Sequence, residues 1–279
     1  KGGNQFVKAT KAEQQLQESE MRLRDLNATL EQRVQKRTVE LERSNAELDQ
    51  FAYVASHDLK APLRHVDNLA SWIAEDAAML LPPTAQKHLA QLRERIKRMD
   101  RMLDDLLTYA RIGRVAGDIE MVAVGDLIAD VVYFLAPPPG FTITLESEMP
   151  TLLTLRTPLA LIFRNLISNA IKHHNHPAVG QVVITAADAG EFIKFRVRDN
   201  GPGIEAEYHQ RIFGMFQTLK PRDQVKGSGM GLAIVKKAVE QWGGQIGIES
   251  AVGQGVTIYF IWPKQIKGEW TSPDAPHKA

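Results

Sequence analysis

A histidine with a neighbouring carboxylate lies in the middle of a long helical stretch, in Ser56-His57-Asp58-Leu59-Lys60-Ala61-Pro62-Leu63. An imidazole titrates near neutral pH, so one ring nitrogen can act as a nucleophile while the other donates a hydrogen bond. The Asp58 carboxylate can accept that hydrogen bond, fix the tautomer and stabilise positive charge on the ring. A surface histidine beside an aspartate is common, so this pair alone does not indicate a catalytic site.

A second group of reactive side chains lies on the helix predicted over residues 158–174. Its apolar residues share one face, and Asn165, Asn169 and Lys172 lie on an adjacent face at i, i+4 and i+7. Amide oxygens can coordinate Mg²⁺ and a lysine can neutralise phosphate oxygens, although a solvated polar face would explain the same residues. His173 is expected to contact a nucleotide. A histidine metal site is not expected here, because no cysteine or acidic partner lies at ligand spacing.

A carboxylate ends the strand predicted over residues 192–199. Asp199 shares the parity of the apolar residues in this strand, so it should point into the covered face. A buried carboxylate needs a hydrogen-bond donor, and the exocyclic amino group of adenine would supply one. Gly201 and Gly203, which precede Ile204, permit a close approach of the backbone to a ligand. A simple turn would explain these glycines equally well, but it would not explain the buried carboxylate.

A glycine-rich stretch, Lys226-Gly227-Ser228-Gly229-Met230-Gly231-Leu232, opens the helix predicted over residues 227–242. Glycines at a helix N-terminus present backbone N–H groups and the positive end of the helix dipole to phosphate. The polar stretch before it contains Phe213, Phe216, Lys220 and Arg222, and it is predicted to form a lid over the nucleotide. A nucleotide site downstream of His57 indicates that His57 receives a phosphoryl group.

The helix that carries His57 is predicted to span residues 9–78, with Pro62 as a point where it kinks or loosens. Two series of residues recur every seven positions: Leu16, Leu23 and Leu30, then Val34, Leu41, Leu48 and Ala55. This spacing suits the seam of a parallel coiled-coil dimer, in which Asn45 would fix the register. A long amphipathic helix packed within one chain is the alternative. We favour the dimer, because no second apolar element precedes the histidine.

A proline turn at residues 80–84 and a second amphipathic stretch ending near Gly113 predict a helical hairpin, of which two copies make a four-helix bundle. A hinge is expected over residues 111–117. Beyond it, strands are predicted over 141–145, 181–187, 192–199, 245–250 and 256–262. The predicted fold is therefore an all-α helical hairpin with an N-terminal coiled coil, followed by an α+β sandwich whose sheet is covered by helices on one face.

The composition of the 279 residues excludes several classes of protein. A formal net charge of +1 argues against a nucleic-acid-binding protein. The absence of cysteine excludes disulfides, thiolate zinc sites and cysteine nucleophiles. No apolar run approaches the roughly 20 residues of a membrane span. The chain begins Lys-Gly-Gly, and we expect a missing upstream sensor, with any membrane attachment through that region only.

These stretches together resemble the sensor histidine kinases of two-component signalling, over most of the chain. The residues from His57 to Leu63 resemble the phosphoacceptor box of this family, and those from Asn165 to Lys172 its asparagine box. The stretch at Asp199 resembles the first glycine box of the family, residues 211–216 its phenylalanine box and residues 227–232 its second glycine box. Residues 253–257 resemble the last glycine box, and all of these stretches occur in the family's order.

The resemblance implies a Bergerat-type ATP-binding domain with ATP and Mg²⁺ as ligands. Asn169 would be a Mg²⁺ ligand, Asn165 a polar contact beside it, and Asp199 the residue that recognises adenine. Thr257 would support the contact between Asp199 and adenine. His57 would attack the γ-phosphate of ATP, and the phosphoryl group would pass to an aspartate of a response regulator receiver domain. The kinase portion would act in the cytoplasm.

The implied domains are a signalling coiled coil (1–45), a dimerisation and phosphotransfer domain (46–113), a catalytic ATP-binding domain (114–265) and a flexible tail (266–279).

Two departures from the family pattern affect function. Ala61 replaces the Thr or Asn that members with phosphatase activity usually carry, so strong phosphatase activity is not expected. Thr218 replaces a frequent arginine, whose phosphate contact would pass to Lys220, Arg222 or Lys226.

Two other functions remain open from the sequence. One is an ATPase of the wider superfamily, of the chaperone or mismatch-repair type, which would not need a phosphoacceptor such as His57. The other is a pseudokinase or scaffold that binds ATP and only dimerises. Substitution of His57 distinguishes them, because only a kinase would lose its phosphoryl label.

Overall fold

The computed structural model describes residues 2–77, 80–113, 118–219 and 227–266. The chain divides into two compact units, residues 1–51 and 52–279, and the boundary between them falls within the first helix. Helix α1 (Gly2–Asp76) continues through Pro62, so the proline does not end it. Helix α2 (Pro83–Arg111) starts with a proline, whose missing N–H is not needed in the first turn.

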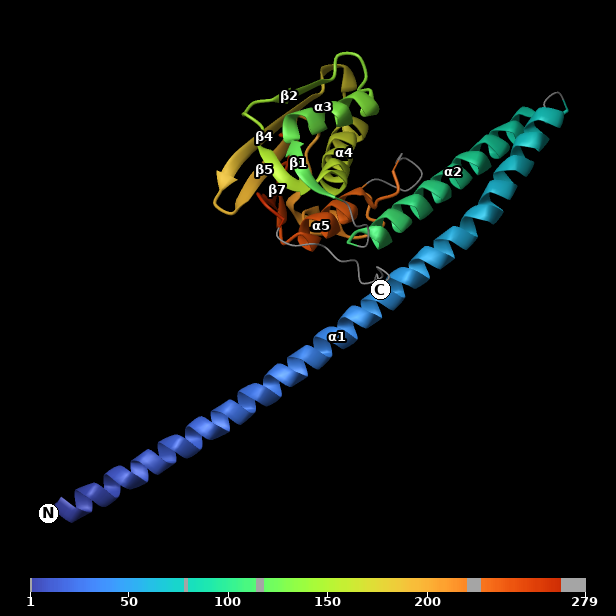
Figure 1. Cartoon of the computed structure of the whole chain (residues 1–279). Helices are drawn as coiled ribbons and strands as arrows, with labels where there is room; N and C mark the ends of the chain where they lie inside the picture. Colours follow the sequence, from blue (N-terminus) through green and yellow to red (C-terminus); the bar gives the residue numbers. More distant parts are fainter. Residues whose placement is uncertain (1, 78–79, 114–117, 220–226, 267–279) are drawn as a thin grey trace. The chain divides into compact units, whose positions relative to one another are not determined.

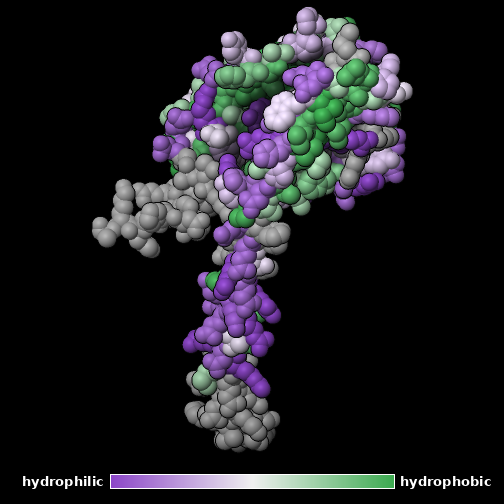
Figure 2. All heavy atoms as spheres, turned by 90° about the vertical axis from the view of Figure 1, so that its right-hand side faces the viewer, coloured by the Kyte–Doolittle hydropathy of each residue, from purple (hydrophilic) through white to green (hydrophobic). Residues whose placement is uncertain are grey.

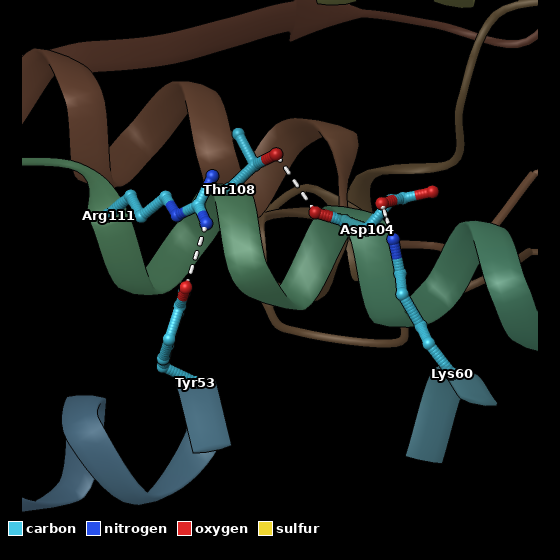
Figure 3. A network of polar contacts seen from close by, with 5 residues as sticks. All are labelled: Tyr53, Lys60, Asp104, Thr108 and Arg111. Atoms are coloured by element: carbon cyan, nitrogen blue, oxygen red, sulfur yellow. Dashed lines mark hydrogen bonds and ion pairs between the residues drawn. The ribbon is translucent and has the colours of Figure 1, made fainter. Parts of the chain in front are cut away.

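The part of α1 beyond residue 52 and α2 form the predicted helical hairpin. Ser56, Ala70, Ile96, Leu107 and Ala110 are buried in it. Polar contacts between the two helices fix their register (Figure 3). The Lys60 ammonium pairs with the Asp104 carboxylate, and an Arg111 nitrogen donates to the Tyr53 hydroxyl at 3.3 Å.

A five-stranded mixed sheet forms the centre of the second domain (Figure 1). Its order is β2 (Thr142–Leu145), β4 (Gln181–Ala189), β5 (Phe192–Asp199), β7 (Val256–Pro263) and β6 (Ile246–Ser250). The pair β2–β4 is parallel and the other three pairs are antiparallel. A separate antiparallel pair consists of β1 (Ile119–Ala123) and β3 (Thr151–Leu155).

Helices α3 (Val124–Leu135), α4 (Arg156–His173) and α5 (Gly231–Gln241) cover one face of the sheet (Figure 1). Their apolar residues share one core with the sheet, in which the rings of Phe163, Phe195 and Phe260 lie 5.2–5.7 Å apart. The buried indole N–H of Trp262 donates to the Thr154 hydroxyl at 2.9 Å, so no donor is left unpaired there. The predicted helical hairpin followed by an α+β sandwich is confirmed.

Several elements differ from the prediction. The sequence did not reveal β1, α3 or β3, nor the short 3₁₀ helices Pro177–Val179, Ala206–Tyr208 and Arg211–Phe213. Helix α5 begins at Gly231 and not at Gly227, because Gly229 has a φ of +76°, which a right-handed helix does not accept. The predicted hinge from residue 114 and the tail from residue 267 lie outside the described residues.

Many large apolar side chains are exposed on the two helices, and Figure 2 shows hydrophobic patches at the surface among hydrophilic residues. On the helices they are Met21, Leu23, Leu26, Leu30, Val34, Val39, Tyr53, Val54, Leu59, Val66, Leu69, Trp72 and Ile73, followed by Leu92 and Met99. The side chains of Leu16, Leu41, Asn45 and Leu48 lie outside the described residues. None of the helices that the structure describes combines the length and the apolar character needed to cross a membrane.

Candidate active site: a phosphoacceptor helix and a nucleotide pocket

The orientation of α1 in the hairpin exposes His57. Its neighbour Ser56 is 1% exposed, whereas the side chains of His57 and Asp58 are each 73% exposed. The ring nitrogen Nδ1 of His57 lies 3.2 Å from Oδ1 of Asp58, as the prediction requires. With the tautomer fixed in this way, Nε2 carries a lone pair and has no hydrogen-bond partner among the described residues. The contact between His57 and Asp58 agrees with the prediction, and the structure adds that both side chains are exposed.

A cavity of about 790 Å³ is bounded by α4, the two glycine stretches and α2. It brings together most of the residues predicted to contact ATP. These are Asn165, Asn169, Lys172, His173, Asp199, Gly201, Gly203, Ile204, Gly227, Ser228, Gly229, Gly231 and Leu232. Residues from α4, from the loop after β5 and from the start of α5, far apart in sequence, therefore share one cavity.

Other predicted residues take different places. Met230 is fully buried, and Phe216 approaches the glycine stretch through its backbone, with its carbonyl carbon 2.9 Å from where a Cβ on Gly229 would stand. Thr257 pairs with Arg198 in the sheet, so its side chain shares the face of Arg198, opposite that of Asp199. The structure brings Val256, not Thr257, to the Asp199 carboxylate. Lys226, Lys220 and Arg222 lie outside the described residues.

Asp199 ends β5 with its carboxylate directed into the cavity. Its Oδ1 accepts hydrogen bonds from the backbone N–H groups of Gly201 (2.8 Å) and Val256 (3.2 Å). Burial raises the pKa of this carboxyl above its ordinary value, and the two backbone hydrogen bonds oppose the shift. Oδ2 accepts no hydrogen bond from the residues that the structure describes, so it is available to a donor on a ligand.

Gly231 opens α5 directly against the two asparagines of α4. A Cβ at this position would stand 3.2 Å from Oδ1 of Asn165 and 3.5 Å from Nδ2 of Asn169. The amide nitrogen of Asn165 donates to the Leu161 carbonyl at 2.8 Å, which fixes that side chain with its oxygen toward Gly231. The two amides therefore face the N-terminal turn of α5, where the helix dipole favours an anion.

Lys172 lies one turn further along α4, where its side chain remains partly exposed to solvent. Burial lowers the pKa of its ammonium group, and the neighbouring Asp105 carboxylate partly offsets that effect. The ammonium group lines the same cavity as the glycine stretch, so it can reach the phosphates of a bound nucleotide.

Gly203 sits where the loop after β5 touches the loop before β7. Its φ is +74°, and a Cβ would overlap the Ala251 carbonyl oxygen. Gly190, in the β4–β5 turn, has the same φ of +74° but nothing within 4 Å of its Cβ position. Alanine substitutions at Gly190 and Gly203 therefore distinguish two contributions to lost stability: the strain of a left-handed backbone, which both share, and steric overlap, which occurs only at Gly203.

Gly190→Ala should lower the free energy of unfolding by about 1–2 kcal/mol, which is the strain of a left-handed alanine. Gly203→Ala should lower it by about 1–3 kcal/mol more and weaken nucleotide binding, because the loop must shift. Urea unfolding of both variants measures the difference. Equal losses would show that the contact with Ala251 is unimportant.

Several lining residues were not predicted from the sequence. Arg101, Asp104 and Asp105 come from α2, and Arg164 comes from α4. His174 contacts the Asn200 amide oxygen at 2.9 Å, and that oxygen also accepts the Gln181 N–H, so the loop after β5 is held to β4. No sequence signal marks these residues, because their roles depend on which elements meet in the fold.

The cavity residues fit ATP and Mg²⁺. Oδ2 of Asp199, which accepts no hydrogen bond from the described residues, suits an adenine amino group, and the backbone N–H groups at the start of α5 suit phosphate oxygens. The side-chain oxygen of Asn169 is the type of ligand that Mg²⁺ prefers, and Mg²⁺ takes few protein ligands when phosphate supplies others. The donor set is therefore adequate without a carboxylate cluster.

Comparison with known proteins agrees with this site. Residues 47–114 match the His Kinase A (phospho-acceptor) domain, and residues 154–266 match the histidine kinase-, DNA gyrase B- and HSP90-like ATPase domain. Cyanobacterial phytochrome A from Nostoc is 38% identical over 227 residues, which are 80% of this chain and 29% of that protein. The methanogenesis regulatory histidine kinase FilI of Methanothrix harundinacea is 31% identical over 82% of this chain and 26% of its own length.

A solved structure of full-length ShkA in complex with AMPPNP is similar to this chain, with a TM-score of 0.59 and 26% identity over 80% of this chain and 47% of that one. The chain spans less than a third of the length of the two curated relatives. Both family domains occur in the order and at the positions of the phosphoacceptor helix and the nucleotide cavity. The chain therefore belongs to the histidine kinases, which join a phospho-acceptor domain to an ATPase domain of this type.

Proposed function

We propose that the chain is an ATP-dependent protein histidine kinase that phosphorylates itself on His57 and passes the phosphoryl group to an aspartate of a response regulator receiver domain. The observation that carries the proposal is the exposed His57–Asp58 pair on the helix that leads into the unit containing the ATP-type cavity. An input from an upstream sensor, beyond this chain, would control the reaction.

In the proposed reaction, Nε2 of His57 attacks the γ-phosphorus, an N–P bond forms, and the bond from that phosphorus to the bridging oxygen breaks as ADP leaves. Asp58 keeps the proton on Nδ1 and stabilises the positive charge that develops on the ring. Asp199 orients the nucleotide through adenine, while Lys172 and the N-terminus of α5 hold its phosphates. Mg²⁺ held by Asn169 would neutralise the negative charge of the transferring group.

The exposed apolar residues of α1 and α2 support a parallel homodimer in which two hairpins form a four-helix bundle. Leu23, Leu30 and Val34 of the predicted seam are each 58–59% exposed in the single chain. A second copy would bury them, and each fully buried aliphatic side chain contributes about 1.5–3 kcal/mol. The proposed boundaries are those given by the sequence: coiled coil 1–45, dimerisation domain 46–113 and catalytic domain 114–265.

Ala61 supports a kinase with little phosphatase activity, because a methyl group cannot position a hydrolytic water. We place the kinase portion in the cytoplasm, where ATP and receiver domains are found.

The proposal is tested by incubating the purified chain with Mg²⁺ and ATP labelled at the γ-phosphate. A kinase should retain a label that is lost in acid and stable in alkali, as expected for phosphohistidine. Asn169→Ala should reduce the rate of labelling by about 100-fold or more, because charge neutralisation at the phosphates is lost.

The alternatives give other outcomes. An ATPase would release inorganic phosphate without retaining label, and a scaffold would bind ATP without either reaction. Ser168, next to Asn169 on α4, is a matched site in the cavity wall, and Ser168→Ala should label at nearly the parental rate. Equal losses in both variants would argue against a specific role for Asn169.

A further inference from the structure

Two adjacent carboxylates, Asp104 and Asp105 in the last third of α2, form hydrogen bonds with different partners. Asp104 accepts a hydrogen bond from Lys60 of α1, three residues after His57 (Figure 3). Asp105 accepts a hydrogen bond from the Ser228 hydroxyl of the glycine stretch. Neighbouring helical residues lie about 100° apart around the axis, so one turn of α2 can contact both the phosphoacceptor helix and the nucleotide cavity.

Asp105 lies at the phosphate end of the cavity. It lines the cavity with Ser228 and Lys172, and its negative charge acts on the Lys172 ammonium. Ser228 is further fixed because its oxygen accepts the Met230 N–H at 3.1 Å, in the turn that leads into α5. The carboxylate is thus directed at two groups that a bound phosphate would also use.

An anion and a carboxylate cannot share these donors without a penalty. Two negative charges a few ångströms apart repel, and the repulsion is stronger in a partly buried cavity than in water. We propose that Asp105 is a positioning residue that holds α2 against the nucleotide cavity through Ser228 and Lys172 and is displaced from both by the phosphates of ATP. This proposal rests on the proposed ATP site and adds a means by which nucleotide binding reaches α2.

Two more contacts attach the end of α2 to α5. The Lys237 ammonium lies 4.3 Å from the centre of the Tyr109 ring, and a Cβ on Gly113 would stand 2.7 Å from the side-chain amide carbon of Gln241. Release of Asp105 from Ser228 would leave these two contacts in place, and Asp104 would stay paired with Lys60. ATP binding would thus weaken the attachment of α2 to the nucleotide cavity without separating α2 from α1.

The coupling between ATP binding and the Asp105 contact can be measured, because each must weaken the other equally. If ATP phosphates displace Asp105, then the Asp105 charge must weaken ATP binding by the same free energy. Adenosine has the same base and ribose but no phosphate, so its affinity should not depend on Asp105.

The test compares dissociation constants of ATP and adenosine, by calorimetry, for the parent chain and Asp105→Asn. Asparagine can still accept the Ser228 hydrogen bond but carries no charge. We expect ATP to bind at least about fivefold more tightly to the variant, with adenosine unchanged. The gain should be larger without Mg²⁺, because free ATP carries more negative charge. Glu94→Gln is the control: it removes one charge from an exposed site on the same helix, paired with Lys97 at 3.9 Å, and should change neither constant.

Three results would overturn the proposal. They are an unchanged ratio of ATP to adenosine affinity in Asp105→Asn, an equal change for both ligands, and the same gain in Glu94→Gln. If the parent chain binds neither ligand, the proposed ATP site itself is wrong. If the parent chain binds both ligands but the ratio of ATP to adenosine affinity is the same in Asp105→Asn, the ATP site stands and only the proposed role of Asp105 is wrong.

Discussion

A His57→Gln variant should retain no phosphoryl label from ATP while binding the nucleotide as tightly as the parent chain. Glutamine is polar and of similar size, but its amide nitrogen has no lone pair available for attack on phosphorus. The His57 side chain is 73% exposed, so the exchange should leave the hairpin intact. Labelling at saturating ATP, the dissociation constant and the melting temperature together separate loss of the acceptor from loss of the fold.

His65 provides the matched control for this experiment. It is an exposed histidine on α1, two turns beyond His57, without an aspartate beside it. His65→Gln should label at the parental rate. Label that persists in His57→Gln, or that disappears in His65→Gln with the fold intact, would contradict the assignment of His57 as the acceptor.

Asp199→Asn should weaken ATP and adenosine binding by about 100-fold or more without unfolding the chain. The exchange replaces an acceptor at Oδ2 by an NH₂ group, which would meet the amino group of adenine donor to donor. A buried donor left without a partner in the complex accounts for a loss of this size. Both ligands should be affected, in contrast to the phosphate-specific effect of Asp105.

The stability of this variant follows from the pKa of Asp199. Burial raises the pKa of the folded state above 3.8, so the folded chain holds this proton more strongly than the unfolded chain does. The contribution of this group to stability is therefore present at low pH and is lost as pH rises through the raised pKa. At pH 7 the ionised carboxylate opposes folding, so Asp199→Asn should not lower the melting temperature.

Adenosine affinity of the parent chain should fall as pH is lowered through the raised pKa of Asp199, while the weak affinity of Asp199→Asn should not follow it. Asp188→Asn is the control, because Asp188 is an exposed carboxylate on β4 that pairs with Lys264 at 2.5 Å. Binding equal to that of the parent is expected for this control. A melting temperature that collapses in Asp199→Asn would indicate a structural role instead.

Periodicity explains why much of the site could be predicted from the sequence. Asn165, Asn169 and Lys172 share a helical face, and Asp199 continues the apolar parity of a strand, so local geometry sets where each side chain points. The exposure of His57 follows in the same way from its place relative to the apolar positions of α1. Local geometry therefore predicts which way a side chain points on a helix face or at a strand end.

Tertiary contacts explain what the sequence could not predict. Asp105 reaches Ser228, 123 positions later in the chain, and nothing local to α2 marks that meeting. The family resemblance predicts that Thr257 supports Asp199, but strand alternation turns the Thr257 side chain to the face opposite Asp199. The sequence predicts the first turn of α5 four residues too early, because closely spaced glycines allow either a helix start or the left-handed conformation that Gly229 adopts.

The hydrogen bonds at Asp199 also set an order of assembly. One donor, the Gly201 N–H, follows the carboxylate by two residues, whereas the other, the Val256 N–H, follows it by 57. During synthesis on the ribosome, the hairpin of α1 and α2 can form from local contacts long before β7 is made. His57 is thus exposed early, but the Asp199 carboxylate, which is proposed to bind adenine, receives its second hydrogen bond only once β7 has paired with β5. A nascent chain would present the acceptor well before it could bind the donor of the phosphoryl group.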